Sequence, residues 1–98
     1  LGYQRQDGYF SWQLQAMEGP ADSSATGMIC AALKRGLELD LFAGERYENA
    51  LLGGRRALEK AVRDGLVFRC SGECEGFSRY PQNYGAYPWS LGPALEVF

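Results

Sequence analysis

Hydrophobic residues recur every three or four positions between residues 19 and 39, which predicts a loop that becomes an amphipathic helix. Pro20 ends the preceding extended segment, because the residue before a proline is pushed away from helical geometry. The oxygens of Asp22 and Ser23 can accept hydrogen bonds from the free N–H groups of the first helical turn. The apolar face comprises Ala25, Met28, Ile29, Ala32, Leu33 and Leu37. A capped helix with this face, rich in small residues, is typical of a buried helix in an all-α core.

A second helix is predicted between about Gly44 and Arg63, where apolar and charged residues again recur at helical spacing. Its apolar stripe comprises Tyr47, Ala50, Leu51, Leu58, Ala61 and Val62. Gly53 and Gly54 lie inside this pattern at a cost of roughly 1 kcal/mol each relative to alanine, so they either kink the helix or admit a close neighbour. The Asp64-Gly65 pair is expected to end the helix.

The other segments carry weaker patterns. Residues 9–15 (YFSWQLQ) roughly alternate around aromatic side chains, which predicts a short strand or an extended strap over a core. Residues 66–68 resemble a brief strand, and residues 69–87 have no sustained period. A connection of that length is usually a functional loop. Residues 88–98 (PWSLGPALEVF) look like the start of another helix.

These elements predict an all-α fold that is part of a larger helical array. Two helices and part of a third leave the first helix little against which to pack its apolar face. Arrays of helical hairpins often repeat in structure without an obvious sequence repeat. We therefore expect further helices to complete the core.

Charge and composition narrow the possible functions. A net charge of -2 gives no electrostatic signature for nucleic acid or for an anionic membrane. No apolar run approaches the roughly 20 residues of a membrane span. Neither nucleic acid nor a membrane is therefore expected as a partner. Histidine is absent from the sequence, which removes the commonest general base and the commonest metal ligand.

The three cysteines do not predict a metal site. Cys30 lies within the first predicted helix and is most simply a small buried hydrophobic residue. Cys70 and Cys74 are close in sequence, but a zinc site would need two further ligands and no histidine can supply them. Free thiols are the simplest expectation, with a reducible disulfide in this loop as the alternative.

Several motifs occur in a familiar order. Asp-Gly-Tyr-Phe-Ser-Trp-Gln occupies residues 7–13, and Asp-Ser-Ser-Ala-Thr-Gly-Met occupies residues 22–28. Tyr47 and Ala50 then open the second predicted helix, and Tyr-Pro-Trp-x-x-Gly-Pro follows at residues 87–93. In this order and spacing the motifs resemble the last third of the unsaturated glucuronyl and rhamnogalacturonyl hydrolases. These enzymes are the six-hairpin glycosidases of glycoside hydrolase families 88 and 105.

The resemblance implies an (α/α)6 barrel, of which residues 1–98 would be the C-terminal part of a single catalytic domain. Enzymes of this kind remove a 4,5-unsaturated uronic acid from oligosaccharides left by polysaccharide lyases. An aspartic acid protonates the C4=C5 vinyl ether and water adds at C5, so no metal or organic cofactor is expected. The resemblance places the catalytic residues upstream, and we assign none to this chain. Such an enzyme would be cytoplasmic if it is a typical bacterial member.

Six residues are candidate substrate contacts. Four of them are aromatic residues on which sugar rings could stack: Trp12, Tyr84, Tyr87 and Trp89. Core packing or loop anchoring is the alternative for these four, with Trp89 expected to be the most buried. Asp22 and Ser23 lie at a loop-to-helix junction that would face the cleft of a barrel, and plain N-capping is their alternative.

Charged residues of the long loop are weaker candidates. Arg79 could pair with a uronate carboxylate, as arginine does bidentately, although a solvated loop arginine is the alternative. Glu73 and Glu75 are interpreted as surface charges. The expected partners are thus an oligosaccharide with an unsaturated uronic acid and the remainder of the barrel.

Two other kinds of function stay open at this stage. The chain could be a stand-alone carbohydrate-binding or protein-interaction helical module without catalysis, with its tyrosine-rich loop as the binding surface. It could also be a helical fragment with no activity of its own. An upstream segment with an aspartate at a helix start would favour the hydrolase, whereas a signal peptide directly before the chain would favour the module.

Overall fold

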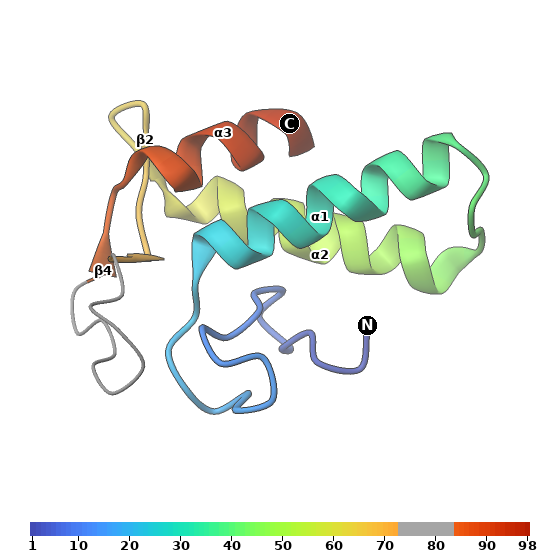
Figure 1. The fold of residues 1–98 in the computed structure, drawn as a ribbon, viewed down its shortest axis with the longest axis horizontal. Coiled ribbons are helices and arrows are strands. Elements are labelled where there is room, and N and C mark those ends of the chain that lie inside the picture. Colours follow the sequence, from blue (N-terminus) through green and yellow to red (C-terminus); the bar gives the residue numbers. More distant parts are fainter. Residues whose placement is uncertain (73–83) are drawn as a thin grey trace.

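The computed structural model describes residues 1–72 and 84–98, where three helices dominate the fold (Figure 1). They are α1 (Ser23–Glu38), α2 (Glu45–Ala61) and α3 (Pro88–Val97). Four short strands form two antiparallel pairs: β1 (Val62–Arg63) with β2 (Leu66–Val67), and β3 (Cys70–Ser71) with β4 (Tyr84–Gly85). Helix α1 packs against both α2 and α3, and Figure 1 shows α1 and α3 running in the same direction while α2 runs back.

Helix α1 begins and ends close to the predicted positions. Asp22 is its N-cap and accepts a hydrogen bond from the Ser24 N–H at 3.1 Å. The small residues of its first turns let α3 approach closely, because a methyl group on Gly27 would lie only 2.9 Å from Pro93 Cβ on α3. The cap therefore forms as predicted, but the predicted apolar face is wrong for these 98 residues. Helix α1 buries Thr26, Gly27, Cys30 and Leu33 against α2 and α3, whereas Met28 and Ala32 of the predicted face are exposed.

Helix α2 continues without a break through the two glycines. A Cβ on Gly54 would collide with the Sγ of Cys30 on α1. The backbone carbonyl of Gly53 lies directly against Gly8 of the N-terminal segment, so that a Cβ on Gly8 would collide with it. The sequence allowed either a kink in the helix or a close neighbour at these glycines, and the structure shows close neighbours.

A tight hairpin ends α2 two residues before the predicted end. Val62 pairs with Val67, and Arg63 pairs with Leu66, so both leave the helix to join a ladder. Asp64 and Gly65 form the turn with φ of 53° and 75°. These left-handed values match the hairpin turns that favour Asp-Gly.

The long segment 69–87 was predicted to be a loop without regular structure, and this is wrong at both of its ends. Cys70 pairs with Gly85, and Ser71 pairs with Tyr84, so the segment is closed by a two-residue ribbon. Strands this short show no alternation that a sequence pattern could detect.

Residues 9–11 are extended and residues 12–15 form bends and a turn, so the segment is a strap over its first part and not a strand of a sheet. A single antiparallel bridge joins Ser11 to Ala21. The Tyr9 hydroxyl donates to the Ala57 carbonyl at 2.8 Å, and the Phe10 N–H donates to Thr26 Oγ1 at 2.9 Å. The strap is thus fastened to both α2 and α1.

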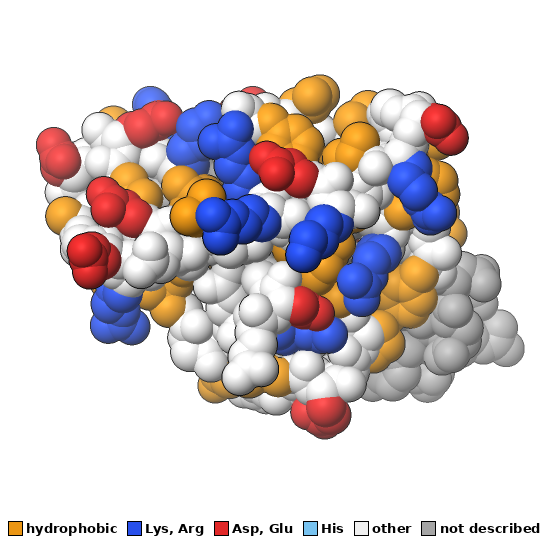
Figure 2. All heavy atoms as spheres, turned by 180° about the vertical axis from the view of Figure 1, so that it is seen from behind, with side chains coloured by type: hydrophobic (Ala, Val, Ile, Leu, Met, Phe, Trp, Pro, Cys, Tyr) orange, Lys and Arg blue, Asp and Glu red, His pale blue; other side chains and the backbone are white. Residues whose placement is uncertain are grey.

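The exposed faces of the helices differ in chemistry. Helix α2 presents mostly charged side chains, and Figure 2 shows many of the lysine and arginine groups on the rear face. Helices α1 and α3, with the link after α1, instead expose apolar residues: Met28, Leu39, Leu41, Leu91, Leu95 and Phe98. Among the described residues, no helix has both the length and the apolar character needed to cross a membrane.

Candidate functional site

The starts of α1 and α3 and the β3–β4 pair lie together at one end of the molecule (Figure 1). Ser71 connects them, because its N–H donates to Asp22 Oδ1 at 3.1 Å and its carbonyl accepts from Trp89 Nε1 at 3.1 Å. Ser90 Oγ donates to the Val67 carbonyl at 2.9 Å. Each of these bonds joins segments far apart in the sequence. We call this region the α1–α3 junction.

Asp22 lies at the centre of the junction as a buried cap. Its side chain accepts from the Ser24 hydroxyl at 2.9 Å on both oxygens, in addition to the N–H groups of Ser24 and Ser71. Only 5% of the residue is exposed. Oδ2 accepts only from the Ser24 hydroxyl among the described residues, which leaves it acceptor capacity. A substrate contact at Asp22 stays a prediction.

Ser23 is fully buried beside Asp22. Its N–H donates to the Arg69 carbonyl at 2.9 Å, whereas its hydroxyl has no hydrogen-bond partner among the described residues. Its role as a substrate contact also stays a prediction, because no surface of Ser23 is exposed here.

Two of the predicted aromatic residues form a stacked pair at the start of α3. The rings of Tyr87 and Trp89 lie 4.9 Å apart with an angle of 6° between their planes. Trp89 is 39% exposed, so the expectation that it is the most buried of the four aromatic residues is wrong. The physical reason is that Trp89 Nε1 is fixed to Ser71 while the body of the ring lies at the surface. The pair offers a rigid aromatic surface of the kind on which sugars stack.

Tyr84 lies at the edge of the junction and is 36% exposed. Partial burial, and next the negative charge of Asp22, raise the pKa of its phenol. The phenol is therefore protonated at neutral pH and can donate a hydrogen bond.

Trp12 is half-buried on the strap. Its N–H donates to the Pro20 carbonyl at 2.9 Å, next to the bridge between Ser11 and Ala21. This position puts Trp12 near the start of α1 in the chain path, but the described contacts do not join it to the aromatic pair of α3. Ser71 is the link between the other candidates, because it bonds to Asp22 and Trp89 and pairs with Tyr84, while Tyr87 stacks on Trp89.

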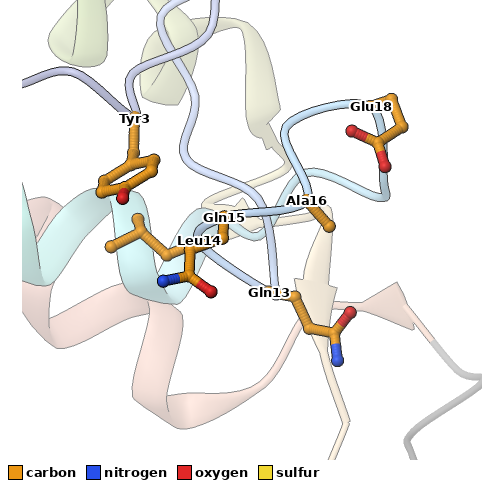
Figure 3. Close-up of a pocket in the computed structure, with 6 residues that line it drawn as sticks. All are labelled: Tyr3, Gln13, Leu14, Gln15, Ala16 and Glu18. Atoms are coloured by element: carbon orange, nitrogen blue, oxygen red, sulfur yellow. The ribbon is translucent and has the colours of Figure 1, made fainter.

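A shallow hollow of about 600 Å³ opens beside the strap (Figure 3). Tyr3 and Leu14 form one end and Glu18 lies at the other, with amide side chains between them. Its lining residues are Tyr3, Gln13, Leu14, Gln15, Ala16 and Glu18. Sequence reasoning did not single out these residues, although the glutamines alternate directly after Trp12. Amides and apolar surface can bind hydroxyl groups of a sugar, and Glu18 is the single carboxylate in this lining.

The cysteines are not suited to nucleophilic catalysis. Cys30 and Cys70 are buried free thiols, and Cys74 lies outside the described residues, as do Glu73, Glu75 and Arg79. Burial raises the pKa of the Cys30 thiol to about 11 and also raises that of Cys70. Both thiols are therefore protonated at neutral pH, whereas the thiolate is the reactive form.

Metal binding finds no support in the part of the chain that the structure describes. Within residues 1–72 and 84–98, no three His, Cys, Asp or Glu side chains are grouped so that they could hold a metal ion. Asp22, the carboxylate of the junction, is engaged by serine side chains and N–H groups instead.

Comparisons with known proteins identify the fold. No protein-family model matches the sequence, and no curated protein matches it. Two solved structures match 98% of the chain with a TM-score of 0.85. Both are described as crystal structures of a possible member of the GH105 family, from Salmonella enterica serovar Paratyphi A at 14% identity and from Klebsiella pneumoniae at 16% identity.

The chain spans only 26% of each of these two structures. The predicted all-α fold and its likeness to GH105 structures are therefore confirmed, as one portion of a larger fold. At this level of identity the likeness concerns the fold alone. The place of residues 1–98 at the C-terminal end of a catalytic domain stays a prediction.

Proposed function

We propose that this chain is part of a glycoside hydrolase that removes a 4,5-unsaturated uronic acid from lyase-generated oligosaccharides. The observation that carries this proposal is the fold shared with two GH105 structures over nearly the entire chain. In the proposed reaction an acid protonates the vinyl ether and water adds at C5. The α1–α3 junction supplies sugar contacts, and the remainder of the barrel supplies the acid.

The aromatic pair of α3 supports a sugar-binding role. Stacking at 4.9 Å covers one face of each ring, so a pyranose would stack on an outer face of the pair, where Trp89 is 39% exposed. The hydrogen bond from Trp89 Nε1 to the Ser71 carbonyl holds the indole before a ligand arrives. A surface fixed in this way loses little side-chain entropy when a sugar binds.

The burial and hydrogen bonding of Asp22 support a catalytic acid elsewhere in the barrel. A general acid must reach the substrate and exchange its proton, whereas Asp22 is 5% exposed and accepts bonds from Ser24 and Ser71. In the proposed enzyme Asp22 therefore positions the start of α1 and the ribbon that holds Trp89.

The distribution of exposed residues supports a larger barrel. The exposed surface of α2 is mostly charged, as suits an outer helix in contact with water. The exposed surfaces of α1 and α3 include Met28, Leu91 and Leu95, which suits helices covered by neighbours. We therefore propose α1 and α3 as inner helices and α2 as an outer helix.

The test follows the ultraviolet absorbance of a 4,5-unsaturated disaccharide after addition of the complete protein that contains this chain. Loss of the double bond removes the absorbance, so we expect a steady decrease. A saturated disaccharide of the same composition, assayed by sugar release, is the control and should not be cleaved. A folded complete protein that leaves the absorbance unchanged would contradict the proposal.

The same experiment separates the second candidate function, a carbohydrate-binding module without catalysis. The shallow, amide-lined hollow beside the strap favours this alternative, because its two glutamines offer hydrogen bonds to hydroxyl groups and Glu18 is the single carboxylate in its lining, whereas hydrolysis by two carboxylates needs a pair. Saturable binding of the disaccharide with no change in absorbance would support the module.

A further inference from the structure

The outer face of α2 and the hairpin after it carry a concentration of positive charge. Residues 55–69 hold five of the ten basic side chains of the chain and only two acidic ones. All five basic residues are exposed: Arg55, Arg56, Lys60, Arg63 and Arg69. Figure 2 shows several lysine and arginine side chains on the rear of the molecule, with acidic side chains among them. The concentration is notable because the chain as a whole has a net charge of -2.

Helical spacing places two of these cations side by side. Arg56 and Lys60 are four residues apart on α2, so their Cβ atoms lie about 5–6 Å from each other. Neither has an acidic partner among the described residues, whereas the nearby Arg55 lies 3.5 Å from Glu59. Two like charges without a counter-charge repel each other, and an anion bound between them would relieve that repulsion.

Aromatic rings hold two further cations in fixed positions beyond the helix. The guanidinium of Arg63 lies 4.3 Å from the centre of the Phe68 ring, and that of Arg69 lies 4.5 Å from the centre of the Tyr9 ring. Stacking occupies one face of each guanidinium and leaves N–H groups at its edge. Those groups can bind a carboxylate bidentately.

These cations lead toward the α1–α3 junction. Arg69 contributes its backbone carbonyl to the N–H of Ser23 at the start of α1, at 2.9 Å. The exposed cations are also separate from the packed side of α2, where the buried residues are Ala50, Gly54, Ala57, Leu58 and Ala61. A chain that follows the cations from Arg56 to Arg69 would therefore end beside the proposed sugar contacts.

We propose that Arg56, Lys60, Arg63 and Arg69, which we call the basic face, bind a polysaccharide with a carboxylate on each sugar ring. The identity of this polyanion rests on the proposed function, because a uronyl hydrolase acts on chains that carry such carboxylates. The basic face holds the uncleaved part of the chain outside the cleft. Charge complementarity argues for this partner, since a chain of carboxylates can engage several exposed cations at once.

The test measures binding of fluorescent polygalacturonate to the complete protein by anisotropy, at low and at high salt. We expect the double variant Arg56→Gln/Lys60→Gln to bind roughly fivefold more weakly at low salt, because two exposed charge contacts are lost. High salt should reduce the difference. The matched control is Arg35→Gln/Arg46→Gln, which removes the same charge from exposed positions outside the basic face and should bind like the unmodified protein.

Turnover of the short unsaturated disaccharide distinguishes the two proposals, since Arg56 and Lys60 lie on α2 and take no part in the hydrogen bonds of the junction. Both double variants should turn it over normally if the proposed function holds. Salt-dependent binding that the Arg56/Lys60 variant weakens, without any turnover, would overturn the proposed function and support the basic face. Unchanged binding in that variant would overturn the basic face. Equally tight binding of single-stranded DNA with the same number of charges would also overturn it.

Discussion

At the scale of single residues, Asp22 shows how one side chain joins three segments. The Asp-Ser-Ser pattern predicts that it caps α1, and the structure shows that cap. Its bond to the Ser71 N–H could not be predicted, because the two residues are 49 positions apart and Ser71 belongs to a two-residue strand. The sequence thus indicates that Asp22 caps α1, but it does not indicate that the β3–β4 pair also bonds to Asp22.

The Asp22→Ala substitution tests this joining role. We expect it to lower the free energy of unfolding by roughly 2–3 kcal/mol, because it removes the cap and leaves the buried Ser71 N–H unpaired. Its matched control is Ser23→Ala, which removes a buried hydroxyl without a partner among the described residues and should be neutral or slightly stabilising. Urea denaturation measures both. Equal losses in the two variants would be inconsistent with the assigned hydrogen bonds.

Cys30 should make the protein less stable in alkali. Burial raises the pKa of its thiol from 9.0 to about 11, so between these values the unfolded chain loses a proton that the folded chain keeps. The unfolded state then binds fewer protons, and the free energy of unfolding must fall as the pH rises. We expect this fall to be shallower in Cys30→Ala than in the unmodified protein when denaturation is measured across pH 9 to 11. Parallel curves would contradict the burial of an ionisable thiol at this position.

At the scale of elements, periodicity predicts the three helices well and the strands poorly. The helical segments are long enough to repeat a pattern several times, whereas each strand has two residues. Helix α2 ends at Ala61, two residues before the predicted end near Arg63, because Val62 and Arg63 pair in the β1–β2 hairpin. Tertiary contacts decide such boundaries, and a single sequence does not reveal them.

The two glycines of α2 should respond to alanine in opposite directions. Gly54→Ala places a methyl group on Cys30 Sγ, so we expect a loss of about 1–3 kcal/mol in the free energy of unfolding. Gly53→Ala meets only ordinary contacts at 3.5 Å and beyond, so its gain in helix propensity should leave stability unchanged or raised by up to about 1 kcal/mol.

Adding Cys30→Ala to Gly54→Ala should recover part of the lost stability, because the colliding sulfur is removed. Denaturation curves of the unmodified protein, Gly53→Ala, Gly54→Ala and the double variant Cys30→Ala/Gly54→Ala measure these changes in the free energy of unfolding. A loss at Gly53 that equals the loss at Gly54 would show that the sulfur contact is not the cause.

At the scale of the whole molecule, α1 and α3 expose apolar faces that a self-sufficient domain would bury. Leu95 on α3 is 64% exposed in these 98 residues, and Met28 on α1 is 54% exposed. The fold matched by the chain is almost four times as long as the chain itself, which gives such faces a natural covering. The partial packing of the first helix was therefore predictable from the sequence, while the identity of its covering residues was not.

A charge at Leu95 distinguishes a covered face from an open one. In the complete protein, Leu95→Asp should lower the free energy of unfolding by about 2–4 kcal/mol, because the carboxylate would be buried without a partner. The control is Leu52→Asp on the mostly charged face of α2, where we expect a change within about 0.5 kcal/mol. Thermal or chemical unfolding measures both variants. Equal, small effects would mean that α3 lies open to solvent.

The most direct test of the central claim is the KM of the complete protein for the unsaturated disaccharide after changes at Trp89. Trp89→Ala should raise KM roughly tenfold, which corresponds to the loss of about 1.4 kcal/mol of apolar contact between the sugar and the indole. Trp89→Phe keeps a ring without the Nε1 bond to Ser71 and should retain most of the affinity. Leu52→Ala, an exposed control on α2, should leave KM unchanged. If Trp89→Ala has the same KM as the unmodified protein, the α1–α3 junction does not contact the sugar and the account is wrong.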